Sequence, residues 1–131
     1  MSITKDSNRQ DVLHASVEIS YADLVSGAAS AAIELPGGAI VITGDVTVIT
    51  PFNSVTSDVI DVGDSVTANR YLNDGNIHAA GRVALVPTGY VMPNVGDLSV
   101  TYVSAGGLPT AGLVRLSVCY VVDGRACTSQ G

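Results

Sequence analysis

Hydrophobic and polar residues alternate along several segments of this chain with the period of two that half-buried β-strands show. Residues 15–21 alternate Ala15, Val17, Ile19 and Tyr21 with Ser16, Glu18 and Ser20. Residues 97–103 place Leu98, Val100 and Tyr102 on one face, and residues 113–122 place Val114, Leu116, Val118, Tyr120 and Val122 on one face. The pattern predicts three strands with these apolar faces turned inward.

Other strands are predicted from apolar runs bounded by Gly and Pro, over residues 31–35, 39–50, 57–62, 81–87 and 89–92. The run 39–50 is long and has Gly44 at its middle, with Ile40, Ile42, Val46 and Val48 expected on one face. A glycine inside a strand often marks a bend, so this strand is expected to contribute to two sheets. Residues 64–72 are expected to form a helical turn capped by Asp64 or Ser65, and residues 73–76 a turn that ends it.

Seven or eight short strands with almost no helix indicate an all-β fold: a single antiparallel sandwich, a jelly-roll-like domain or a barrel. This domain is expected over residues 12–131. Residues 1–11 are polar and lack periodicity, which predicts a flexible N-terminal arm.

The composition suggests that part of the surface is covered by a partner. Hydrophobic residues make up 47% of the 131 positions and charged residues only 14%, against about 25% charged residues in typical domains. Apolar surface left over after core formation is commonly buried in an assembly, so a homo-oligomer or an assembled particle is expected. A monomer with an uncharged polar surface is the alternative.

The net charge is −6, and the six Lys and Arg residues are scattered, which argues against nucleic-acid binding. No apolar run is long enough for a membrane-spanning helix, so no membrane partner is expected. The polar start predicts no signal peptide and synthesis in the cytoplasm. That compartment favours free thiols at Cys119 and Cys127, although a pair between them is possible.

No catalytic constellation is recognisable. The chain has two histidines, His14 and His78, and no Gly-x-Ser-x-Gly segment. Both histidines are interpreted as ordinary surface or interface residues. We therefore expect no enzymatic activity, no catalytic residues and no cofactor.

Asp58, Asp61 and Asp64 are weak candidates for a calcium site, because hard carboxylate oxygens near Gly63 and Ser65 suit that ion. Three-residue spacing in an extended chain sends successive carboxylates to opposite faces, and it misses the spacing of a calcium loop. The favoured interpretation is that these acidic residues keep a sheet margin solvated, and no metal is expected.

Residues 33–125 resemble small structural proteins of tailed-bacteriophage virions, of the capsid decoration or cement type. The resemblance rests on Leu-Pro-Gly-Gly-Ala-Ile-Val-Ile-Thr-Gly at 35–44, Pro-Phe-Asn-Ser at 51–54, Asp-Val-Gly-Asp at 61–64, Asn-Arg-Tyr-Leu at 69–72, Ala-Ala-Gly-Arg at 79–82 and Pro-Thr-Gly-Tyr at 87–90. It implies a β-rich protein that binds the outside of the assembled head as dimers or trimers. There it would bridge major capsid protein subunits and stabilise the shell, so the expected location is the virion surface.

On this interpretation the contact regions are the arm, the loops 51–57 and 104–110, and residues 64–80. The residues expected to make contacts are Lys5, Arg9, Phe52, Asn53, Arg70, Tyr71 and Leu108. The alternative is a virion fibre or tail protein, or another glycan-binding β-sandwich module. A glycan-binding module would expose Tyr71 or Tyr90 beside a calcium ion held by the acidic residues 58–64.

Overall fold

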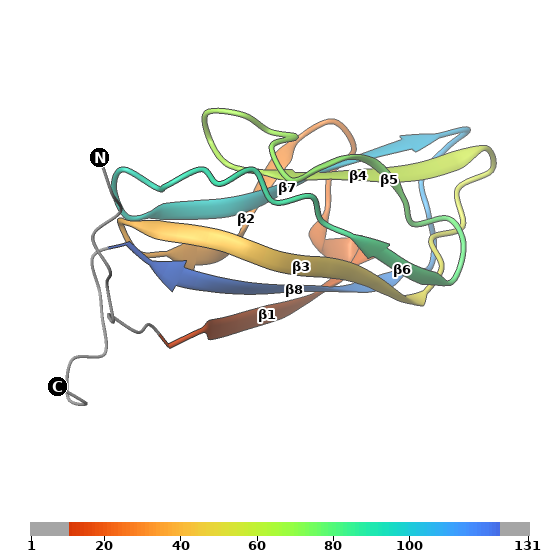
Figure 1. Cartoon of the computed structure of the whole chain (residues 1–131). Helices are drawn as coiled ribbons and strands as arrows, with labels where there is room; N and C mark the ends of the chain where they lie inside the picture. The colour runs from red at the N-terminus through yellow and green to blue at the C-terminus, as the bar shows by residue number, and fades with distance from the viewer. Residues whose placement is uncertain (1–10, 124–131) are drawn as a thin grey trace, which may run out of the picture.

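Residues 11–123 are described by the computed structural model, and they form eight strands and one short 3₁₀ helix. The elements are β1 (Leu13–Ser20), η1 (Tyr21–Asp23), β2 (Ala29–Leu35), β3 (Ala39–Thr50), β4 (Ser57–Gly63), β5 (Leu72–Asn76), β6 (Gly81–Ala84), β7 (Gly96–Ala105) and β8 (Leu113–Val122). Two four-stranded antiparallel sheets stack face to face (Figure 1). The prediction of an all-β sandwich is confirmed.

The strand order identifies the sandwich as a jelly roll. One sheet has the order β1-β8-β3-β6 and the other β2-β7-β4-β5. The first strand pairs with the last, the second with the seventh, the third with the sixth and the fourth with the fifth. This is the pattern of one long antiparallel hairpin rolled up, and the β3–β8 and β4–β7 pairs complete the two sheets.

The core lies between the sheets and is built from alternate residues of their strands. Val114, Leu116 and Val118 of β8 are buried, as are Leu98, Val100 and Tyr102 of β7. The inward faces predicted for these residues are confirmed. Tyr21 is an exception, because the chain leaves β1 after Ser20 and Tyr21 begins η1 with a partly exposed side chain.

Strand β3 departs from the predicted pattern in two respects. It belongs to one sheet only, so the expected bend into two sheets is wrong. A register shift between Val41 and Thr43 changes which residues face the core, so Val41 is buried whereas Ile42 is exposed. Gly44 instead permits close packing: a Cβ there would lie 2.6 Å from the Ser117 carbonyl oxygen and 2.7 Å from Leu85 Cδ1.

The helical turn expected over residues 64–72 is not present. The carboxylate of Asp64 accepts hydrogen bonds from the amides of Val66 and Thr67 (3.0 and 2.8 Å), which folds the segment into a tight loop. The amide of Tyr71 then donates to the Val62 carbonyl (2.9 Å) and returns the chain to the sheet. Residues 73–76, expected as a turn, lie in β5, because pairing with β4 outweighs their weak strand propensity.

Two expectations concern residues outside the described part of the chain. The arm lies almost entirely there, with Lys5 and Arg9, and so does Cys127. Cys119 is half-buried on β8. Within residues 11–123, no helix has the length and apolar character needed to cross a membrane.

Candidate functional site

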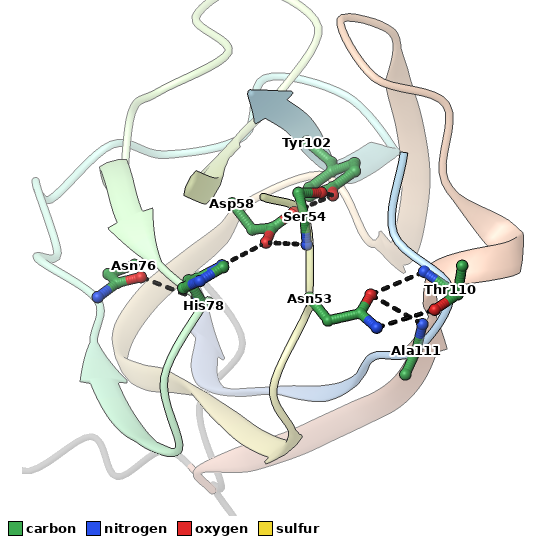
Figure 2. A network of polar contacts seen from close by, with 8 residues as sticks. All are labelled: Asn53, Ser54, Asp58, Asn76, His78, Tyr102, Thr110 and Ala111. Carbon is green, nitrogen blue, oxygen red and sulfur yellow. Dashed lines mark hydrogen bonds and ion pairs between the residues drawn. The ribbon is translucent and has the colours of Figure 1, made fainter. Parts of the chain in front are cut away.

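Three of the inter-strand loops meet at one end of the sandwich, joined by side-chain hydrogen bonds. They are the β3–β4 loop (51–56), the β5–β6 loop (77–80) and the β7–β8 loop (106–112). Figure 2 shows the polar contacts that join them to strands β4 and β7. This end of the molecule, called the loop end below, combines the contact regions expected at 51–57 and 104–110.

Asp58 is the centre of the loop-end network. It lies on β4 with the same parity as the core residues Ile60 and Val62, and it has no solvent exposure. Its Oδ2 atom accepts a hydrogen bond from the Ser54 amide (3.0 Å) and lies 2.7 Å from His78 Nδ1, while the Tyr102 hydroxyl donates to Oδ1. The interpretation of Asp58 as a solvated margin residue is therefore wrong.

The environment favours the charged form of this carboxylate. Burial alone would raise the pKa of Asp58, but the hydrogen bonds from Ser54, Tyr102 and His78 outweigh it and hold the pKa below its ordinary value. The pKa of the Tyr102 hydroxyl is raised, first by burial and then by its bond to the Asp58 carboxylate. The network therefore holds a buried, negatively charged carboxylate, and donors from three segments of the chain satisfy its two oxygen atoms.

Asn53 fastens the β3–β4 loop to the β7–β8 loop. Its Oδ1 atom accepts hydrogen bonds from the amides of Thr110 (2.7 Å) and Ala111 (3.1 Å), and its Nδ2 donates to the Thr110 hydroxyl (2.8 Å). Figure 2 shows these three bonds converging on one side chain. Asn53 therefore acts as a clasp that fixes the position of residues 106–112.

The loops held in this way expose large apolar side chains. Val55 (84% exposed) and Leu108 (78%) lie on them, and the neighbouring β1–β2 loop exposes Val25. We call Tyr21, Val25, Val55 and Leu108 the loop-end patch. Tyr21, Val25 and Leu108 also line a hollow of about 310 Å³, and the segments 24–33, 49–57 and 104–113 contain no charged residue.

A second polar cluster lies on the β4–β5 connection. Arg70 Nε donates to Asp64 Oδ2 (2.6 Å), and the guanidinium carbon lies 3.5 Å from the centre of the Tyr90 ring. The hydrogen bond to Asp64 raises the pKa of Arg70. Burial would raise the pKa of Asp64, but Arg70 and the amides of Thr67 and Val66 lower it. This cluster locks the 64–71 loop against the β6–β7 connection.

The loop-end network resembles part of a hydrolase triad without its reactive geometry. Asp58 orients His78, but Ser54 contacts Asp58 and Tyr102 rather than the imidazole (its Oγ lies 3.3 Å from the Tyr102 hydroxyl). Within residues 11–123, no hydroxyl or thiol is hydrogen-bonded to the remaining ring nitrogen of His78, so the arrangement supplies no activated nucleophile.

The three aspartates proposed as calcium ligands serve separate partners. Asp58 belongs to the loop end, Asp61 accepts the Asp74 amide (2.6 Å), and Asp64 pairs with Arg70. In the described part of the chain, no three His, Cys, Asp or Glu side chains are grouped to hold a metal ion.

The residues expected to make contacts differ in their exposure and in their bonding within the chain. Phe52 and Tyr71 are only 1% exposed, so their assignment as surface contacts is wrong. The Phe52 ring packs at a tilt against the Tyr102 ring, with ring centres 5.1 Å apart. Phe52, the one Phe of the chain, is therefore a core residue. Arg70 is mostly covered by its own cluster and Asn53 is engaged as a clasp, whereas Leu108 is free for contact.

Sequence reasoning missed the Asp58–His78–Tyr102 network and the exposed Val25 and Val55. The sequence did contain a signal for Asp58: it alternates along β4 with the same period as Ile60 and Val62, which places it on the inward face. No comparable signal exists for His78, since its loop reaches β4 only through the fold.

Comparison with known proteins finds similarity at the level of structure. No family model and no curated protein matches the chain. A chain of the cyanophage Pam1 capsid asymmetric unit has a TM-score of 0.71 at 17% identity, covering 93% of this chain and 92% of that chain. A chain of the acidic stable capsid of Helicobacter pylori bacteriophage KHP30 has a TM-score of 0.66 at 15% identity, covering 85% and 87%.

A chain of the Ralstonia phage GP4 capsid has a TM-score of 0.62 at 17% identity, covering 95% of this chain and 92% of that chain. At these identities the similarities show a shared fold. Because nearly equal shares of both chains are covered, each matched chain is about as long as this one.

Proposed function

We propose that this protein is a phage capsid decoration protein that binds the outside of the assembled head and bridges major capsid subunits. The observation that carries the proposal is the structural match of 85–95% of this chain to chains of three phage capsids. In each case the jelly roll is a chain of similar length rather than a domain of a longer subunit. That arrangement fits a small accessory protein added to a shell.

The loop-end patch supplies the surface for this function. Two of its apolar side chains, Val55 and Leu108, project from loops that the Asn53 clasp and the Asp58 network hold in place, so little ordering entropy of these loops is lost on binding. The absence of charge in these loops lowers the cost of desolvation. Many copies, each making a modest contact, would stabilise the lattice collectively.

A structural rather than enzymatic role agrees with the loop-end geometry. The buried Asp58 charge is stabilised by hydrogen-bond donors that position loops, and no activated nucleophile accompanies His78 among the described residues. The glycan-binding alternative required an exposed Tyr71 or Tyr90. Tyr71 is buried and Tyr90 lies against Arg70, so that alternative gains no support from the described residues.

Co-sedimentation with intact capsids of the source phage tests the proposal. Purified protein is mixed with heads that lack it, and the bound copies per particle are counted. We expect saturation at hundreds of copies and heads that survive higher temperature. Saturation at a dozen copies or fewer would place the protein at a vertex, fibre or tail, and no binding would reject a virion surface role.

A further inference from the structure

The four edge strands of the sandwich differ in how well they are protected against pairing with another chain. An edge strand presents unpaired backbone donors and acceptors, and proteins blunt such edges by shortness, irregularity or charge. Strand β6 has only four residues, β2 has a register shift between Ala31 and Ile33, and β5 is short and irregular, with Asp74 in a left-handed conformation (φ 55°).

Strand β1 is neither short nor irregular, and Glu18 is its one acidic residue. Its eight residues pair with β8 in an unbroken register from Leu13 to Ser20, and they include no Pro, Gly or Lys. In the part of the chain that the structure describes, no strand pairs with its outer edge. A regular strand of this length at a sheet edge is a template for one more antiparallel strand.

The side of the sandwich next to β1 is also open. A hollow of about 190 Å³ lies there, lined by the core residues Ile19, Leu24 and Val100 and by Val17, with the charged residues Glu18 and Asp23 also in its lining. The neighbouring residues on β2 are small, with Ala29 and Ala31 exposed. A partner approaching β1 would therefore cover apolar surface beside the small side chains of β2.

We propose that β1 pairs antiparallel with β1 of a second copy of this chain, so that two sheets join into one eight-stranded sheet across a two-fold axis at Ser16. The proposal goes beyond the decoration function and does not depend on it. The occupant is inferred from the sequence of β1, which is complementary to itself in that register.

With the axis at Ser16, His14 of each copy lies opposite Glu18 of the other on the outer face, where both are exposed. On the inner face Ala15 lies opposite Val17 and Leu13 opposite Ile19. Shifting the axis to Val17 would place His14 opposite Ser20, and shifting it to Ala15 would place Glu18 opposite Val12. The Val17 axis would place Ser16 opposite Glu18, so the Ser16 register is the one of the three that places an imidazole opposite each carboxylate.

The two-fold arrangement also explains why this edge need not cause aggregation. An isologous contact uses the same strand on both copies, so each dimer closes and leaves no β1 edge for a third chain. The edges that remain at the ends of the joined sheet are those of the four-residue strand β6. The low content of charge in the chain fits a protein that buries a further edge in this way.

Disulfide trapping tests this register. In a background with Cys119→Ser and Cys127→Ser, Ser16→Cys places two thiols opposite each other at the axis, where opposed Cβ atoms are about 4.5–5.5 Å apart. The matched control is Ser20→Cys on the same face of the same strand, because the register places Ser20 outside the His14–Glu18 pair. Its two copies would lie about 26 Å apart, eight residues along the ladder, beyond disulfide reach.

Under mild oxidation we expect Ser16→Cys to form a covalent dimer at least about tenfold faster than Ser20→Cys, because the paired strands create a high effective concentration. The unaltered chain should sediment at twice the monomer mass. Equal rates for the two variants, a monomeric or trimeric unaltered chain, or cross-linking of Ser16→Cys only to a different protein would each overturn the proposal.

Discussion

The Nδ1 atom of His78 lies 2.7 Å from the Oδ2 atom of Asp58, and this contact joins the β5–β6 loop to the buried inward face of β4. The two residues are 20 positions apart in the chain. Asp58 has no solvent exposure, whereas the His78 side chain is partly exposed, so the pair extends from the core to the loop end. The contacts of this carboxylate determine how firmly the loop end is held.

Replacing Tyr102 with Phe tests how much the hydrogen bonds to the Asp58 carboxylate contribute to the free energy of unfolding. The change removes the hydroxyl that donates to Asp58 and leaves a buried charge with one donor fewer. We expect the free energy of unfolding to fall by about 1–3 kcal/mol, measured by urea denaturation. Tyr120→Phe is the control, because Tyr120 is half-buried and its hydroxyl has no hydrogen-bond partner among the described residues. Equal losses in the two variants would contradict this account.

Acid should weaken the fold through the same group. The pKa of Asp58 is lowered in the folded state from an ordinary value of 3.8. Its contribution is therefore fully present above that value and is lost as the pH falls through the lowered folded-state pKa. We expect Asp58→Asn to cost about 2 kcal/mol near neutral pH and clearly less near pH 2.

Unfolding free energies measured at several pH values test this dependence. Asp97→Asn, which alters an exposed carboxylate on β7, is the control and should retain the acid-dependent loss of stability. If the cost of Asp58→Asn were the same at every pH, the proposed ionised state of Asp58 would be wrong.

The Arg70 cluster should contribute more to stability than an exposed ion pair of the same length. Arg70→Gln leaves the buried Asp64 carboxylate without its main partner and removes the contact with Tyr90. We expect a loss of about 1–3 kcal/mol. Arg82→Gln breaks a pair of equal distance, 2.6 Å to Asp45, but its side chain is 60% exposed. That control should cost no more than about 1 kcal/mol, and the reverse order in thermal unfolding would refute the argument.

The loop-end patch makes a prediction about capsid binding. Leu108→Asp introduces charge into an uncharged apolar surface at a side chain that is 78% exposed, so stability should change little. Binding to heads should weaken by about tenfold or more, because the new charge must be desolvated in the contact. Val86→Asp, at a residue 67% exposed on the β6–β7 connection and outside the expected contact regions, is the matched control. Similar losses for both variants would mean that the loop end is not the contact surface.

The sequence determined the fold class and much of the core. Strict alternation in β7 and β8 fixes which face is buried, because a strand with one apolar face has only one favourable orientation. Alternation in β4 likewise places Asp58 on the inward face with Ile60. Because Asp58 is charged, it was instead predicted to be exposed to solvent, and that prediction was wrong.

What only the tertiary structure decided depends on contacts between distant segments. The register shift in β3 reverses the parity of Ile42, and nothing in a local window signals where a bulge will lie. Residues 72–76 become a strand because β4 is available to pair with them. The Asn53 clasp and the Asp58–His78 contact arise because the jelly roll brings the loops after β3, β5 and β7 to the same end, a result of strand order that periodicity along the chain does not contain.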